Sequence, residues 1–196
     1  HPDFSLNGAK AIYSLTGYYG ILGYRTQDDR DIAKDSPDRP AFEAYRAAEI
    51  EAVKPVIARL KDTGWTFGSH TWGHIRLESK PLQTIINDTE RWADEVGSLV
   101  GPTNVLFYPH GGRPDGDDWH KTGERFQYLQ SQGFRIFASV GVNSFSYVKK
   151  DISAVICDRL HPDGTTLRHS RSRYLQFYNA EDIIDLSVRP DLGVDW

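Results

Sequence analysis

An alternation of helix-like and strand-like segments is the sequence feature that most constrains this fold. After about residue 40 the chain repeats one unit: a segment of helical periodicity, a glycine that ends it, a short apolar run and a polar loop. Such alternation is typical of βα units, in which the strands lie parallel and helices cover the sheet. The sequence therefore predicts an α/β fold built on a parallel sheet or barrel.

The individual segments are short and clearly bounded. Helices are expected over 41–64, 81–98 and 121–131, and strands at WTFGS, VLFYP, FRIFASV and SAVICDRL. Pro40 suits the first turn of the first helix, Gly64 ends it, and Pro55 inside it predicts a kink or a split into two helices. Residues 1–40 are interpreted as one strand and loops. We expect a single domain over 1–196, with a loop-rich portion at 1–40 and βα units over 41–196.

Composition excludes several classes of function. The chain has 196 residues, 39% hydrophobic and 26% charged, with a net charge of −4. No apolar run approaches the roughly eighteen residues of a membrane helix, and the acidic balance does not favour nucleic acid as a partner. Cys157 is the only cysteine, so neither a disulfide within the chain nor a thiolate metal cluster can form. Because the chain starts without Met and without a signal peptide, we expect it to be the interior of a longer protein.

A pair of histidines follows the first strand of the repeat. The segment SHTWGH places His70 and His74 four residues apart. Neutral imidazole is the commonest metal ligand, and chemistry in parallel α/β folds lies in loops at the carboxyl ends of strands. We therefore expect both side chains to bind a divalent metal. Two polar residues ending a strand would give the same spacing.

A second loop, LFYPHGGRPDGDDW, follows the next predicted strand. Gly111 allows the backbone to approach a ligand closely, and N–H groups in such a turn can stabilise an oxyanion. Tyr108 and Trp119 are candidates for stacking on a sugar, and His110 is a candidate ligand or acid. An ordinary turn rich in Gly, Pro and Asp would show the same composition.

Two later histidines are candidates for a general acid. His161 follows the strand SAVICDRL, and His169 follows in LRHSR. Surface positions would explain both equally simply.

With SHTWGH and FYPHGG together, the chain resembles the polysaccharide deacetylase family, the NodB-homology domain of carbohydrate esterase family 4. His70 to His74 match that family's H-[ST]-x-x-H motif at every defined position, and Pro109 matches its R-x-P-Y motif, with His110 in place of the aromatic. The resemblance spans about residues 45–160. It implies a distorted (β/α) barrel, zinc or another divalent metal on His70 and His74, and backbone donation to an oxyanion by the loop at 108–112.

The chain departs from the family pattern at three places. The family's first motif is an Asp pair, of which one Asp is a metal ligand and the other the general base, and nothing in residues 1–64 fits it; Asp28-Asp29 lies in a polar loop. We expect this motif upstream of His1. Phe107 replaces the expected Arg. The final Leu-x-His motif has one literal match, which ends at His169, and His161 is its rival as the late catalytic histidine.

These observations predict a metal-dependent hydrolase that removes N- or O-acetyl groups from a carbohydrate, with the isolated segment poorly active because a ligand is missing. Two alternatives stay open. One is a non-catalytic carbohydrate-binding domain on the same scaffold, stacking sugars on Trp72, Tyr108 and Trp119. The other is a metal-dependent amidohydrolase of another small N-acyl substrate. The resemblance alone implies a location outside the cytoplasm, and the expected partner is a carbohydrate or a small N-acetylated compound.

Overall fold

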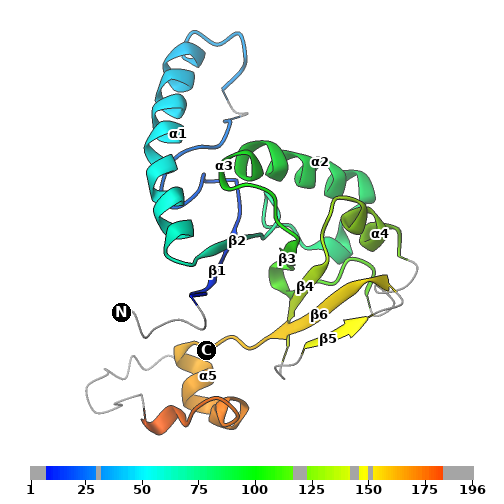
Figure 1. The fold of residues 1–196 in the computed structure, drawn as a ribbon. Helices are drawn as coiled ribbons and strands as arrows, with labels where there is room; N and C mark the ends of the chain where they lie inside the picture. Colours follow the sequence, from blue (N-terminus) through cyan, green and yellow to red (C-terminus); the bar gives the residue numbers. More distant parts are fainter. Residues whose placement is uncertain (1–7, 30–31, 117–122, 142–145, 150–151, 183–196) are drawn as a thin grey trace.

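A single six-stranded sheet organises the chain. The computed structural model describes residues 8–29, 32–116, 123–141, 146–149 and 152–182. The strand order is β1-β2-β3-β4-β6-β5 (Figure 1). The strands are β1 (Ile12–Leu15), β2 (Thr66–Ser69), β3 (Val105–Phe107), β4 (Ile136–Val140), β5 (Ser146–Lys149) and β6 (Ala154–Arg159). All neighbouring pairs are parallel except β5 with β6.

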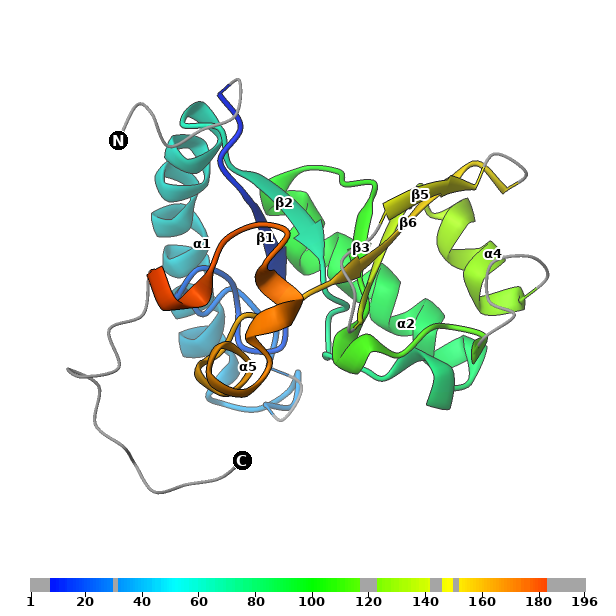
Figure 2. The ribbon, with the colours of Figure 1, turned by 90° about the horizontal axis from the view of Figure 1, so that it is seen from below.

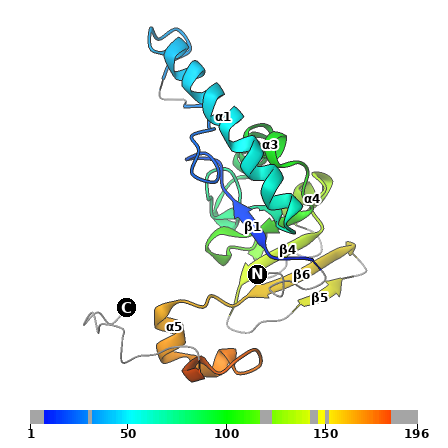
Figure 3. The same ribbon diagram turned by 60° about the vertical axis from the view of Figure 1, so that its left-hand side comes forward.

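Helices cover one side of this sheet. They are α1 (Arg39–Asp62), α2 (Leu82–Trp92), α3 (Ser98–Val100) and α4 (Glu124–Ser131), with a π-helical turn, Ala93–Gly97, between α2 and α3. The last helix, α5 (Gly164–His169), follows β6 and lies on the opposite side of the sheet from α1 to α4 (Figures 1 and 3). Figure 2, viewed from below, shows α5 on the near side of the strands. None of the described helices is long and apolar enough to cross a bilayer.

The hydrophobic core has two parts, each packed against different strands of the sheet. Under α4, buried side chains of β3, β4 and β6 pack together, among them Leu106, Phe137 and Ile156. Under α1 and α2, a second cluster includes Val53, Phe67 and Trp92. Apolar side chains on both faces of short parallel strands are expected, because helices or loops cover such strands.

The predicted α/β fold with a parallel sheet is confirmed, and the strand order is consistent with a distorted barrel. The prediction that Pro55 splits the first helix is wrong, since α1 continues through it. Pro55 is exposed while Val53 and Ile57 are buried, so the hydrogen bond that proline removes lies on the solvent side and packing of the inner face holds the helix together. The sequence did not predict β5.

Candidate active site

Two loops at the carboxyl edge of the sheet bring three histidines together. Since β2 and β3 are parallel neighbours, the loops that follow them leave the sheet at the same edge. The ring centroids of His70 and His74 lie 4.8 Å apart, and those of His74 and His110 lie 4.6 Å apart. The structure thus joins the two motifs that the sequence placed after separate strands. We call these three side chains the histidine cluster.

His70 is held as a neutral imidazole with a defined tautomer. Its Nδ1 lies 2.9 Å from the carbonyl oxygen of Phe107. Because a carbonyl oxygen can only accept, Nδ1 carries the proton and Nε2 keeps its lone pair. Burial lowers the pKa of His70 to about 4, against the opposing effect of the Phe107 carbonyl. Burial also lowers the pKa of His74. Both rings are therefore neutral at pH 7, the state that binds metal ions.

The loop between His70 and His74 is anchored by a buried carboxylate of α2. Asp88 accepts the N–H of Trp72 on Oδ1 and the N–H of Gly73 on Oδ2, both at 2.7 Å. Burial raises the pKa of Asp88, and these two N–H groups act in the opposite direction. Thr71 and His74 adopt positive φ angles of 61° and 52°, which are uncommon for residues other than glycine. Such a conformation persists only where surrounding contacts determine it, and Asp88 supplies two of them.

The loop after β3 is a tight 3-10 turn, Pro109–Gly111, in which His110 has a φ of 57°. The N–H groups of Gly111 and Gly112 donate to the carbonyls of Tyr108 and Pro109 at 3.2 and 3.0 Å. The N–H of Gly111, predicted to face an oxyanion, is therefore engaged in closing the turn. In the part of the chain that the structure describes, the N–H of His110 has no acceptor. It is the donor that this turn leaves for a ligand.

Two of the three aromatic side chains predicted to stack on a sugar, Tyr108 and Trp72, make extensive contacts within the protein. Tyr108 is 0% exposed and packs in the core, so the prediction that its ring contacts a sugar is wrong. Trp72 has one face covered by the guanidinium of Arg91, whose Cζ lies 3.4 Å from the ring centroid, and its Nε1 donates to Glu95. The indole of Trp72 thus mainly packs against the protein beneath the loop that carries His70 and His74. Trp119 lies outside the described residues.

Arg159 is a site residue that the motifs did not reveal. It ends β6, and its guanidinium donates to the carbonyl oxygens of Tyr108 at 3.0 Å and Ser139 at 3.2 Å. Its Cζ lies 5.2 Å from the ring centroid of Phe107, the residue that stands where the family motif has arginine. Burial lowers the pKa of Arg159, and no carboxylate pairs with it among the residues described. A partly buried cation without a counter-charge favours an anionic group nearby. The sequence signal that could have identified Arg159 is a charged residue at the end of a predicted apolar strand.

His161 and His169 lie apart from the histidine cluster in the described structure. His161 is 75% exposed in its side chain and has Nδ1 3.5 Å from Asp163. His169 is exposed at the end of α5, so the literal Leu-x-His match lies on a helix and not on a strand. Neither ring contacts the cluster within these residues. Their catalytic role stays a prediction.

The third metal ligand is absent from the described arrangement. No group of three His, Cys, Asp or Glu side chains within the described ranges is placed to hold a metal ion. Asp28 pairs with Arg39, away from the cluster. Neither β1 nor β3, the two neighbours of β2, ends in an Asp pair, and the expectation of that motif upstream of His1 stays a prediction. β1 is followed by Thr16 and Gly17, neither of which is a carboxylate.

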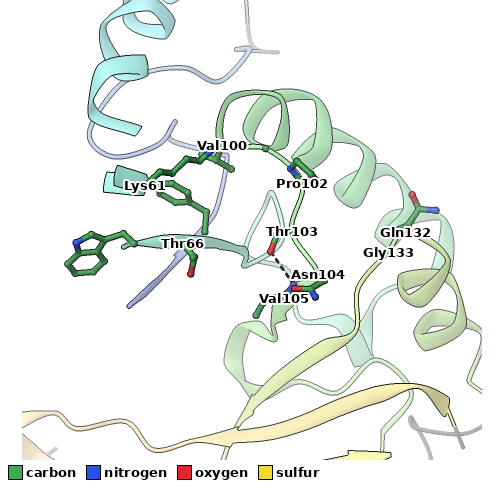
Figure 4. A pocket seen from close by; sticks show the side chains of 12 residues that line it. Lys61, Thr66, Val100, Pro102, Thr103, Asn104, Val105, Gln132 and Gly133 are labelled. Carbon is green, nitrogen blue, oxygen red and sulfur yellow. Dashed lines mark hydrogen bonds between the residues drawn. The ribbon is translucent and has the colours of Figure 1, made fainter. Parts of the chain in front are cut away.

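A cavity of about 830 Å³ lies at the opposite, amino-terminal ends of β2 and β3 (Figure 4). Lys61, Thr66 and Val105 are among the residues that line it. Among the described lining residues Lys61 is the only titratable one, and none is a carboxylate or an imidazole. Acid–base or metal chemistry therefore favours the histidine edge and not this cavity.

The fold and this edge together define an α/β protein with neutral histidines on adjacent loops at the carboxyl ends of its parallel strands. Residues 38–129, which include all three histidines of the cluster, match the family model for polysaccharide deacetylase. Over this region, just under half of the chain, the sequence is similar to the polysaccharide deacetylase family.

A solved structure is also similar to the chain. It is the crystal structure of a candidate polysaccharide deacetylase from Mycobacterium smegmatis, with 10% sequence identity and a TM-score of 0.38. The similarity covers 81% of this chain and 61% of that one, so the chain spans less than two thirds of that protein's length. A search of curated proteins finds no match.

Proposed function

We propose that this protein is a metal-dependent hydrolase that removes N- or O-acetyl groups from a carbohydrate. The observation that carries the proposal is the contact of His70 Nδ1 with the Phe107 carbonyl at 2.9 Å. This contact, between the two loops of the family motifs, orients a neutral imidazole with its Nε2 lone pair available. Metal-binding histidines commonly donate their second ring N–H to a carbonyl in this way.

The two motif histidines fit a divalent ion in chemistry, and the described residues do not complete its ligand set. His70 and His74 would hold the ion, and zinc suits imidazole ligands. A third ligand is required from elsewhere, since no three-ligand group is formed. Such an ion supplies Lewis-acid polarisation of the acyl carbonyl and activation of water.

The chain's own residues provide positive groups for the charge that develops on the acyl oxygen. The N–H of His110 is unpaired within the described ranges, and the Arg159 guanidinium is tied to the neighbouring carbonyl of Tyr108. Arg159 thereby holds the backbone next to His110 while keeping its charge at this edge. Donors and cations held in place before reaction stabilise an oxyanion without reorganisation.

The test combines metal content with acetate release. Purified protein is loaded with zinc, dialysed and measured by elemental analysis, and acetate is then assayed with chitooligosaccharides, peptidoglycan fragments, acetylxylan and small N-acyl compounds. For a protein that carries the third ligand, we expect about one equivalent of zinc per chain and release from a carbohydrate. The segment without that ligand should bind zinc weakly and release little acetate. His70→Ala and His74→Gln should lose both properties, whereas Phe177→Ala, at an exposed residue outside the motifs, should retain both. Release only from small N-acyl compounds would favour the amidohydrolase alternative.

A second candidate function is a non-catalytic carbohydrate-binding domain. The incomplete ligand set favours it, because two imidazoles alone hold a metal weakly. It predicts no stoichiometric zinc, no acetate release, and sugar binding that His70→Ala leaves intact. These outcomes together would refute the deacetylase proposal.

A further inference from the structure

An aromatic-lined cavity of about 550 Å³ lies beside the histidine loop, outside the motifs considered so far. Tyr18 and Tyr19 line it from the segment after β1, Phe42 and Tyr45 from the start of α1, and Trp72 from the histidine loop. Its volume is within the usual range for small-ligand sites. We call it the aromatic cavity.

The aromatic side chains of this cavity are exposed to an extent that a core does not explain. Tyr19 is 66% exposed, Tyr45 53% and Tyr18 38%. Aromatic faces that gather around a concave surface are typical of binding sites, whereas single exposed apolar residues need no explanation. Tyr18 and Tyr19 are adjacent in sequence and their rings contact each other at 4.6 Å between centroids. The group is therefore a shared surface and not a scatter of single residues.

The aromatic cavity and the histidine loop share a wall. Trp72 lines the cavity and stands between His70 and His74 in the sequence. Its carbonyl oxygen accepts the N–H groups of Gly17 and Tyr18 at 2.9 and 3.1 Å. A ligand in the cavity therefore lies next to the loop that carries the metal-binding motif.

The polar groups of the cavity favour a neutral ligand that bears hydrogen-bond donors. Gln27 lines the cavity, and its Oε1 is buried with no hydrogen-bond partner. A buried acceptor without a donor is costly, so a ligand hydroxyl or amide N–H that fills it gains affinity. The charged lining residues are two arginines and two aspartates, Arg25, Arg91, Asp28 and Asp29, which balance in sign.

We propose that the aromatic cavity binds one further neutral pyranose ring of the carbohydrate chain whose acetyl group reaches the histidine cluster. A pyranose ring presents C–H faces to aromatic rings and hydroxyl donors at its edge, which matches tyrosine faces beside a vacant amide acceptor. The choice of a carbohydrate rests on the proposed function. The cavity itself is lined by the segment after β1, α1, Trp72 and Arg91 of α2.

Binding is measured by isothermal titration calorimetry on the whole chain with tetra-N-acetylchitotetraose, xylotetraose and cellotetraose. We expect at least one to bind, and the double variant Tyr19→Ala/Tyr45→Ala to weaken that binding by about tenfold or more. Gln27→Leu, which removes the acceptor and keeps the size, should weaken binding severalfold. Phe177→Ala is the matched control, because Phe177 is 61% exposed and does not line the cavity. Circular dichroism checks that each variant is folded.

The outcomes separate this inference from the proposed function. Binding that the cavity variants weaken and that His70→Ala leaves intact, combined with no stoichiometric zinc and no acetate release by the wild type, supports the cavity and refutes the deacetylase. The inference is overturned if no oligosaccharide binds, if the cavity variants bind as the wild type does, or if Phe177→Ala weakens binding equally.

Discussion

The carboxylate of Asp88 is the contact on which the shape of the histidine loop depends most directly. Asp88→Ala leaves the N–H groups of Trp72 and Gly73 without their acceptor at 2.7 Å. Hydrogen bonds to a charged group contribute about 1.5–3 kcal/mol each, so about 3–6 kcal/mol is at stake. Burial raises the pKa of Asp88, which shows that the charged form carries a desolvation cost that its removal relieves. We therefore expect unfolding free energy to fall by about 2–4 kcal/mol and Tm by roughly 5–15 °C.

Two further variants make this prediction specific. Asp88→Asn retains one acceptor oxygen but turns an NH₂ group toward the second N–H, so it should destabilise nearly as much as alanine. Asp94→Ala removes an exposed carboxylate on the following turn and should change stability by less than about 0.5 kcal/mol. Urea denaturation followed by circular dichroism measures all three, and zinc titration tests whether the loop still binds metal. Equal unfolding free energies for Asp88→Ala and Asp94→Ala would show that the two hydrogen bonds do not hold the loop.

Three other predictions concern the same edge of the sheet. The pKa of His70 falls from 6.5 to about 4 on folding, so the unfolded chain takes up a proton that the folded chain excludes. Stability should therefore decrease as the pH falls from about 6.5 to 4, by roughly 2 kcal/mol after allowing for partial exposure; a stability that is flat over this range in urea denaturation would contradict the assigned pKa. Gly17→Ala would place a Cβ 2.2 Å from Cδ1 of Trp72, and we expect a loss of about 1–3 kcal/mol in unfolding free energy together with weaker zinc binding, whereas unchanged zinc affinity would show that the loop tolerates movement of the indole. Arg159→Gln should lower kcat for acetate release by ~10²-fold with little change in KM. An increase in KM of the same size with kcat unchanged would assign Arg159 to substrate binding instead.

Much of the fold could be predicted because its signals are local. Gly64 and Gly133 follow α1 and α4 and adopt positive φ, so a conformational preference of single residues marks each helix end. Short apolar runs between such ends identify β2, β3, β4 and β6 without any tertiary information. β5 escaped prediction because it is a four-residue segment of mixed polarity, SYVK, which pairs antiparallel to β6. The split expected at Pro55 did not occur, because burial of Val53 and Ile57 outweighs one missing hydrogen bond.

In the candidate site too, local sequence signals predicted some features and the tertiary structure decided others. Sequence alone placed the candidate histidines on loops at one edge, because His70, His74 and His110 follow strands whose carboxyl ends meet there in a parallel sheet. The tertiary structure decided the state of each group. Contact with the Phe107 carbonyl sets the tautomer of His70, and β6 delivers Arg159 beside the ring of Phe107. Burial removes Tyr108 from any sugar. The spacing of residues in the sequence predicts which strand a site residue follows. The burial, tautomer and charge compensation of its side chain depend on neighbours that only the folded chain brings together.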